Sequence, residues 1–217
     1  MSEALRRQLC ETARSMNVSG INQGKSGNLS ARLPAEGSSD LRCLVTPSAV
    51  PYDELVAEDI VELASDGSAR GRRPPSSEWS MHLGILRARP EVGAVLHAHP
   101  TFSTALACHG RRIPAFHYMV AIAGGSDIRC APYATFGTSE LATHAVRALE
   151  GRRACLLSHH GLVVLGSSPG AALALAIEVE TLARQYWHSL LLGEPPELSA
   201  QEMALVLEKF ESYGKPR

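Results

Sequence analysis

The sequence lacks several features that would assign it to a specialised class of protein. No stretch approaches the roughly 18 consecutive apolar residues that span a bilayer. Residues 1–17 mix charged and apolar positions and contain no continuous apolar segment of the kind found in a signal peptide. The five cysteines show no CxxC spacing, and their odd number argues against a complete disulfide framework. We therefore expect a cytoplasmic protein without a membrane partner.

An excess of charge of one sign is also missing. The formal net charge is −1 for 217 residues, so the chain as a whole has no attraction for nucleic acid or for anionic lipid. The proportions of hydrophobic residues, 45%, and charged residues, 20%, are typical of globular proteins. No internal repeat or linker interrupts the sequence, which predicts a single domain over residues 1–217. A bound phosphate would therefore need a local site.

Helical and strand patterns alternate along the chain, which predicts an α/β layered domain. Residues 3–17 have helical spacing that ends near Gly20, and Asp66-Gly67 reads as a turn after a strand. The expected strands cover 42–46, 60–63, 92–98, 154–158 and 162–165. The other expected helices cover 78–88 with Ser77 as N-cap, 171–192 between the Ser168-Pro169 cap and Gly193, and 199–212 after the Ser199–Glu202 capping box.

Two histidine pairs follow apolar strands and suggest a metal site. His97 and His99 are two residues apart at the end of a predicted strand, so both side chains point to the same face. His159 and His160 follow another strand, and because they are adjacent only one of them can join the first pair. Three imidazoles suit zinc, and Glu78 is the best available carboxylate to complete the set.

The remaining histidines lack this pattern and are interpreted as surface residues or as hydrogen-bonded core residues. They are His82, His109, His117, His144 and His188.

Several Gly- and Ser-rich segments can bind an anion. The segment Gly20–Asn28 resembles a P-loop, but three residues rather than four separate Gly20 from Gly24, and it follows a helix rather than a strand. Nucleotide binding is therefore rejected, whereas backbone N–H groups of such a turn can still hold a phosphate. Thr46-Pro47-Ser48 and Ser76-Ser77 offer similar donors, the latter at a helix start.

Taken together, these motifs resemble the L-fuculose-phosphate aldolase family of zinc-dependent class II aldolases. The resemblance spans nearly the whole chain in consistent order. It rests on the segments Gly20–Gly24, Gly27–Ser30, Ser76–Glu78, His97–Pro100, His117–Met119, Ala131–Gly137, His159–Leu162 and Leu207–Gly214.

The resemblance implies a single three-layer α/β/α domain of the class II aldolase and ribulose-phosphate 4-epimerase type, assembled as a homotetramer with active sites between subunits. The helix and tail at 199–217 would reach a neighbouring subunit. One Zn²⁺ per subunit would be bound by Glu78, His97, His99 and His160, with Glu78 also the base and Tyr118 the general acid. The substrate phosphate would contact Asn28, Ser48, Ser76, Ser77 and the loop around Gly27, while Phe136 and Tyr213 would line the aldehyde pocket.

Two positions depart from the family pattern. Lys25-Ser26 stands where relatives often carry Thr before a small residue, and Lys25 would add a cation to the phosphate site. Ala49 replaces a Gly that often follows the Thr-Pro-Thr segment, which predicts a tighter turn there.

The resemblance leaves the substrate open. Our first interpretation is cleavage of L-fuculose 1-phosphate to dihydroxyacetone phosphate and L-lactaldehyde. The alternative is cleavage of 5-(methylthio)ribulose 1-phosphate or 5-deoxyribulose 1-phosphate in nucleoside salvage. A ribulose-phosphate 4-epimerase is less favoured because those relatives typically carry Ser-Ser-Asp where this chain has Ser76–Glu78, and Tyr118 and Phe136 argue against the related methylthioribulose-phosphate dehydratase. The complete set of metal ligands argues against a non-catalytic module such as the adducin head.

Overall fold

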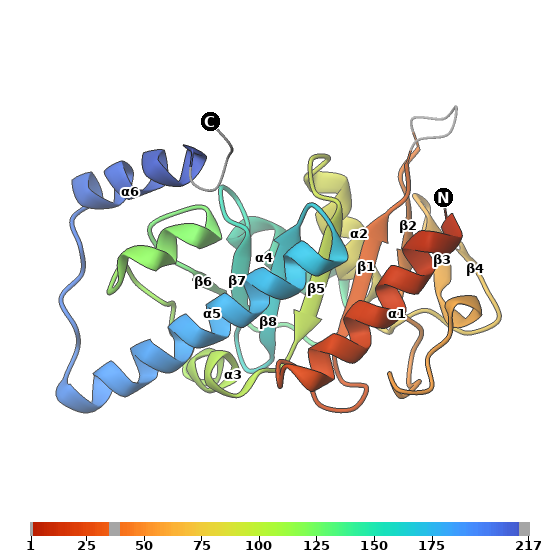
Figure 1. Cartoon of the computed structure of the whole chain (residues 1–217), viewed down its shortest axis with the longest axis horizontal. Helices are drawn as coiled ribbons and strands as arrows, with labels where there is room; N and C mark the ends of the chain where they lie inside the picture. The colour runs from red at the N-terminus through yellow and green to blue at the C-terminus, as the bar shows by residue number, and fades with distance from the viewer. Residues whose placement is uncertain (1, 35–39, 213–217) are drawn as a thin grey trace.

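A computed structural model describes residues 2–34 and 40–212, which form one eight-stranded sheet covered by helices on both faces (Figure 1). The strand order is β4-β3-β2-β1-β5-β8-β7-β6, and every neighbouring pair is antiparallel except β6 and β7. The strands are β1 (Asn28–Arg32), β2 (Arg42–Val45), β3 (Val61–Ala64), β4 (Ala69–Arg70), β5 (Ala94–Ala98), β6 (Arg129–Ala131), β7 (Ala154–Leu157) and β8 (Gly161–Gly166).

The helices divide into two layers that bury separate cores. On one face, α1 packs on β1 and α5 packs on β5 and β8, with α3 beside α5. On the other face, α2 contacts β5, and α4 contacts β6 and β7. The α-helices are α1 (Ser2–Val18), α2 (Trp79–Ala88), α3 (Thr101–Cys108), α4 (Ser139–Ala148), α5 (Pro169–Ser189) and α6 (Ala200–Ser212), with 3₁₀ turns η1 (Ala57–Asp59), η2 (Tyr118–Ala123) and η3 (Leu190–Leu192). The predicted three-layer α/β/α architecture is therefore confirmed.

Most predicted helix ends are confirmed. The Ser168 side chain accepts a hydrogen bond from the Ala171 N–H with Pro169 in the first turn of α5. Ser199 and Glu202 form the expected reciprocal capping box before α6. The helix predicted over 171–192 becomes 3₁₀ after Ser189.

The prediction that Ser77 caps α2 is wrong. The N-cap position is Glu78, which makes no side-chain capping bond, and the exposed Ser77 lies one residue earlier. The Ser76 hydroxyl instead accepts from the Glu78 N–H at 3.3 Å. Glu78 does not cap its own helix because its carboxylate is directed to partners elsewhere, described below.

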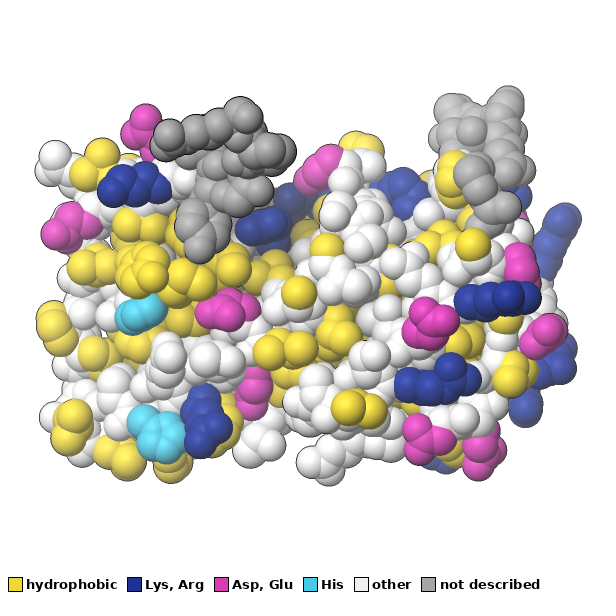
Figure 2. Space-filling model, viewed as in Figure 1, with side chains coloured by type: hydrophobic (Ala, Val, Ile, Leu, Met, Phe, Trp, Pro, Cys, Tyr) yellow, Lys and Arg dark blue, Asp and Glu magenta, His cyan; other side chains and the backbone are white. Residues whose placement is uncertain are grey.

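The surface shown in Figure 2 differs between its two sides. Hydrophobic side chains gather on the left between α6 and the end of α5, whereas Lys, Arg, Asp and Glu intermix on the right around α1. Near the end of α5, Leu191 is 70% exposed and Leu192 is 95% exposed. None of the helices within residues 2–34 and 40–212 is both long and apolar enough to cross a membrane.

Candidate active site

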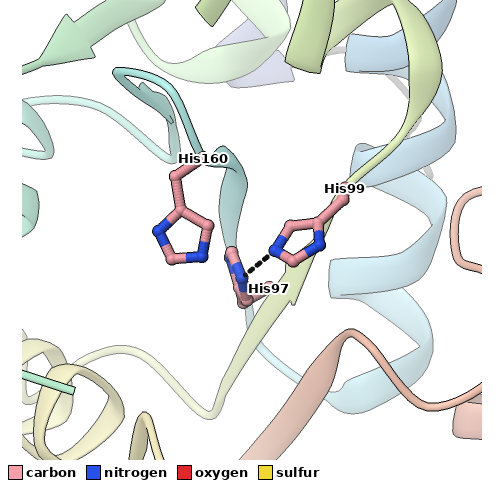
Figure 3. Close-up of side chains that lie close together, drawn as sticks. All are labelled: His97, His99 and His160. Carbon is pink, nitrogen blue, oxygen red and sulfur yellow. Dashed lines mark hydrogen bonds between the residues drawn. The ribbon is translucent and has the colours of Figure 1, made fainter. Parts of the chain in front are cut away.

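Three imidazoles from two segments of the chain converge at one end of the sheet (Figure 3). His97 comes from β5, His99 follows the end of that strand, and His160 precedes β8. Their ligand nitrogens all lie within 4.8 Å of one another, and the Nε2 atoms of His97 and His99 are only 2.9 Å apart. This spacing fits three ligands around a single small ion.

The strand register explains why these side chains meet. His97 lies opposite Val163 in the β5–β8 pair and opposite Asn28 in the β1–β5 pair. In the turn from β7 to β8, His159 has a left-handed backbone (φ 55°), and the next residue, His160, is the one that joins the cluster. The residue pattern alone had left open which histidine of this pair would do so.

Two glycines allow the backbone to pass close to the cluster. A Cβ on Gly161 would lie 2.5 Å from the Ala98 carbonyl oxygen and 2.7 Å from the ring of His99. A Cβ on Gly27 would lie 2.7 Å from the His97 carbonyl oxygen. All three distances are too short for a real side chain, so only glycine fits at either position without displacing a neighbouring residue.

Glu78 faces the three histidines from the start of α2. Its Oε2 lies 3.2 Å from His97 Nε2, and its Oε1 lies 3.4 Å from His160 Nε2. Although Glu78 is only 4% exposed, Oε1 has no hydrogen-bond partner in the described structure. Burial raises the pKa of Glu78, but the facing His97 and the Asn28 amide outweigh that effect and hold the pKa well below its usual range. The carboxylate is therefore ionised at neutral pH.

Two of the histidines, His99 and His160, are held in the neutral state that a metal requires. Burial and the charge of neighbouring His97 lower the pKa of His99 to about 4, and burial likewise lowers that of His160 to about 4. The Nδ1 of His97 lies 3.0 Å from the Leu162 carbonyl oxygen. Because a carbonyl can only accept, Nδ1 carries a hydrogen, so the neutral form of the His97 ring presents its Nε2 lone pair to the cluster.

The donor set fits a divalent cation. Lone pairs of neutral imidazoles and a buried carboxylate oxygen without a donor point at one small volume, and such groups repel one another unless a cation lies between them. Nitrogen-rich sets with one carboxylate suit zinc among the common metals. The residues that would hold it are Glu78, His97, His99 and His160.

A cleft of about 340 Å³ opens beside the cluster. Phe136, 64% exposed, and Ser77 lie in its lining, as does Glu78. Tyr133 and His159 also line the cleft, although sequence reasoning assigned them no role. The only signal for them was their position within the motifs around Phe136 and His160.

The segments predicted to bind phosphate lie beside one another. The Ser48 N–H donates to the Pro74 carbonyl, and the Ser76 N–H donates to the Thr46 carbonyl, so the two segments pair through an isolated antiparallel bridge between Pro47 and Pro75. The Thr46 hydroxyl accepts from the Leu29 N–H, which attaches this pair to β1 next to Asn28.

Two other predicted features of this region have different outcomes. Lys25 is exposed on the turn before β1 and is not among the residues that line the cleft. Ala49 has φ 61°, a left-handed conformation that favours glycine.

Of the two predicted tyrosines, Tyr118 lies within the described residues and does not line the cleft. Tyr118 begins η2, is 51% exposed and does not line the cleft of its own chain. Its ring contacts that of His117, 4.8 Å away between centroids. Tyr213 lies outside the described residues.

His82 was interpreted from sequence as an ordinary helix histidine, but it is completely buried and connected to the site. Its ring lies within hydrogen-bonding distance of Asn28, whose amide contacts Glu78. No local sequence signal indicates this, because residues 28 and 82 meet only in the folded chain.

Comparisons with known proteins identify relatives along nearly the whole chain. The class II aldolase and adducin N-terminal domain family matches residues 7–187. A 5-methylthioribulose-1-phosphate/5-deoxyribulose-1-phosphate aldolase of Rhodospirillum rubrum is 54% identical over 97% of this chain and 93% of its own length. The L-fuculose phosphate aldolase of Escherichia coli K12 is 45% identical over 97% of this chain and 95% of its own. Among solved structures, an L-fuculose 1-phosphate aldolase superposes with a TM-score of 0.90 at 39% identity, covering 96% of each chain.

Proposed function

Since this chain belongs to the class II aldolase family and is a carbon–carbon lyase, we propose that it cleaves 5-(methylthio)ribulose 1-phosphate or 5-deoxyribulose 1-phosphate. The products would be dihydroxyacetone phosphate and methylthioacetaldehyde or acetaldehyde. The observation that carries this choice is the higher identity to the Rhodospirillum rubrum enzyme, 54%, than to the Escherichia coli L-fuculose phosphate aldolase, 45%. It replaces L-fuculose 1-phosphate, which the sequence analysis favoured, as our first candidate.

The lining of the cleft has an apolar part and a polar part. Ala134 and Phe136 give one side an apolar surface. The thioether of methylthioacetaldehyde or the methyl of acetaldehyde suits the apolar part, whereas the hydroxyl of L-lactaldehyde would need a partner among Ser26, Ser77 and Tyr133, which also line the cleft. L-Fuculose 1-phosphate remains the second candidate, supported by the relatives at 45% identity and by the solved structure.

The metal proposed for Glu78, His97, His99 and His160 is zinc, one ion per subunit. When bound, such an ion acts as a Lewis acid toward the substrate carbonyl and balances negative charge on the neighbouring oxygen. The charge and the lone pairs of the four ligands support this proposal.

Glu78 would move the proton at carbon. In condensation, its carboxylate removes a proton from the hydroxyl-bearing carbon beside the carbonyl of dihydroxyacetone phosphate, and that carbon bonds to the aldehyde carbon. In cleavage the C3–C4 bond breaks, and the Glu78 carboxyl returns the proton to C3. Its ionised state at neutral pH and its unpaired Oε1 support the role of base.

Tyr118 would move the proton at oxygen. Its hydroxyl donates to the aldehyde oxygen during condensation and recovers that proton from the C4 hydroxyl during cleavage. Since Tyr118 does not line the cleft of its own chain, this role requires a second copy to supply it. The 51% exposure of Tyr118 leaves it available to another subunit.

We propose the homotetramer implied by the family for this assembly. The exposed leucines at the end of α5, Leu191 and Leu192, provide apolar surface that a neighbour can cover.

The described cysteines are all free, which suits the reducing cytoplasm.

The phosphate would be held by Ser48, Ser76, Ser77 and the loop from Lys25 to Asn28. An Asn amide has two N–H donors, so Asn28 can contact Glu78 and a phosphate oxygen at the same time. Contacts at the phosphate are remote from the bond that breaks, and they orient the reacting carbons.

The experiment is a comparison of kcat/KM for the three ketose 1-phosphates, with dihydroxyacetone phosphate detected through a coupled reductase. We expect both 5-deoxy and 5-methylthio substrates to exceed L-fuculose 1-phosphate by roughly 10- to 200-fold, the discrimination typical of one apolar pocket contact. A preference for L-fuculose 1-phosphate would restore the second candidate, and no cleavage of any of the three would refute both.

A further inference from the structure

His82 is a fully buried ionisable side chain beside the proposed site. It lies on α2 one turn after Glu78, and its exposure is 0%. Both ring nitrogens have partners from β1: Nδ1 is 2.7 Å from the Ser30 hydroxyl, and Nε2 is 2.5 Å from Asn28 Oδ1. Asn28 in turn donates from Nδ2 to Glu78 Oε2 at 2.9 Å. The contacts form a continuous chain from Ser30 to Glu78.

The carboxylate at the end of this series of hydrogen bonds determines where each of their hydrogens lies. An ionised carboxylate only accepts, so the Asn28 amide must turn its nitrogen toward Glu78 and its oxygen toward His82. His82 must therefore carry its hydrogen on Nε2, and the Ser30 hydroxyl must donate to the Nδ1 lone pair. A neutral ring is also what burial favours, since it lowers the pKa of His82 to about 3.

We propose that His82 is a positioning residue that orients Glu78 through Asn28, an inference that rests on the function proposed above. With its oxygen held by His82, the Asn28 amide cannot rotate, because the reverse orientation would place two acceptors, its oxygen and the carboxylate, against each other. Glu78 Oε2 is thereby anchored.

The anchor distinguishes the two oxygens of Glu78. Oε2 is held by Asn28, whereas Oε1, which faces His160, has no hydrogen-bond partner in the described structure. We therefore assign Oε1 as the oxygen that takes the proton from the substrate carbon. The hydrogen bonds of the His82 side chain go to Ser30 and Asn28, so its effect on the Glu78 carboxylate passes through the Asn28 amide.

Two substitutions at position 82 separate positioning from packing. His82→Leu has similar bulk but no donor, so it frees the Asn28 amide. His82→Gln can present its side-chain N–H where the imidazole Nε2–H lies. Leu86→Ala, on the same helix and fully buried, is the control for lost stability without lost hydrogen bonds.

The readout is exchange of the substrate-derived proton of dihydroxyacetone phosphate with deuterated water, together with kcat and KM for cleavage. We expect His82→Leu to lower the exchange rate and kcat about 10- to 100-fold, the usual effect of losing a partner behind a ligand, with a smaller change in KM. His82→Gln should recover most of the rate. Leu86→Ala should lower the melting temperature and keep kcat.

The proposal is overturned if His82→Leu and His82→Gln lose the exchange rate and kcat equally. It is also overturned if Leu86→Ala loses them as much as His82→Leu does, because the role of His82 would then be structural. A wild-type enzyme that exchanges no proton would instead contradict the proposed function.

A second measurement needs neither activity nor metal. Nitrogen NMR of ¹⁵N-histidine-labelled, metal-free protein, with the His82 signals identified by their loss in His82→Gln, reports which ring nitrogen carries hydrogen. We expect the neutral Nε2–H tautomer from about pH 5 to about pH 8, where an ordinary histidine changes charge, and a mixture of tautomers in Ser30→Ala. The Nδ1–H tautomer in the wild type would mean that the hydrogen bonds run in the opposite direction, and it would refute the assignment. This test uses the wild-type protein, so it does not depend on whether His82→Leu folds.

Discussion

The buried half of the proposed site, Glu78 with its three histidines, and the exposed half, Tyr118 with Phe136, differ in how the chain holds them. In the buried half, Glu78 is 4% exposed and His97 is 0% exposed, and the strand register determines where the ligands lie. In the exposed half, Tyr118 is 51% and Phe136 is 64% exposed, and Tyr118 does not line the cleft of its own chain.

This difference separates the chemistry from the choice of substrate. A charged ligand set needs a rigid, largely water-free support, and the interior of one chain provides it. Exposed aromatics at a cleft can change with little cost to the fold, so the exposed half is where relatives with different substrates can diverge. It follows that substitutions in the buried half should stop the reaction, whereas those in the exposed half should alter a site shared between copies.

The largest effect is expected from Glu78→Gln. Without a carboxylate, proton exchange at the carbon of dihydroxyacetone phosphate should fall by about 10²- to 10⁴-fold, the usual contribution of a positioned base. Exchange is followed by NMR in deuterated water, and circular dichroism confirms that the fold is retained. Near-normal exchange in a folded variant would remove Glu78 from the role of base.

Tyr118→Phe tests whether the exposed half comes from a second copy. We expect kcat to fall about 10²-fold or more through loss of the general acid, with little change in KM. The sharper measurement mixes this variant with Glu78→Gln after dissociation and reassembly. In a cyclic assembly about a quarter of the sites would then combine an intact Glu78 with an intact Tyr118 from its neighbour. Recovery of activity confirms a shared site, and its absence from mixed oligomers contradicts one.

Gly161→Ala tests how tightly the buried half is packed. The added methyl would lie 2.7 Å from the ring of His99 and 2.5 Å from the Ala98 carbonyl oxygen, so the ring must move. We expect zinc affinity to fall about 10- to 100-fold, measured by competition with a chromogenic chelator. Gly170→Ala, where a Cβ meets no atom within 4 Å, is the matched control and should bind zinc normally.

The smallest effect is expected from Asp59→Asn. This substitution weakens the ion pairs that hold the segment leading to Ser76 and Glu78. Asp59 is 2% exposed and accepts from Arg72 and Arg73, each at 2.9 Å. Burial raises its pKa, but these two arginines outweigh burial and lower the pKa to about 2.

The sign of the pH effect follows from this lowered pKa. The stabilisation is present above the unfolded value of 3.8 and is lost as pH falls through about 2. Because both arginines are half exposed, we expect a contribution of only about 1–2 kcal/mol to the free energy of unfolding. Urea denaturation at pH 7 and at pH 3 measures it: the variant should be less stable at pH 7, with a smaller difference at pH 3. If the variant and the wild type differ in stability by the same amount at pH 7 and at pH 3, the ion pairs are excluded as the cause.

The sequence predicted the elements whose signals are local. The caps at Ser168 and Ser199 define helix starts without help from the rest of the chain, and the apolar runs before His97 and His160 define buried strands. The two-residue period of a strand was enough to direct His97 and His99 to one face. These features need no knowledge of the fold.

Features that depend on distant contacts were not predicted. The strand β1, Asn28–Arg32, has poor strand formers and follows a Gly-rich turn, and it is a strand because β2 and β5 pair with it from both sides. The link from His82 to Asn28 joins residues 54 positions apart. Which histidine after β7 joins the cluster was settled by the family resemblance, since the residue pattern left both open.

The central claim is that Glu78, His97, His99 and His160 together hold one catalytic divalent ion. The direct measurement is zinc content per chain by native mass spectrometry, in parallel with the rate of proton exchange, before and after dialysis against a chelator. We expect one zinc per chain, loss of exchange with loss of the ion, and recovery of both when zinc is returned. Full exchange activity in metal-free protein would contradict it.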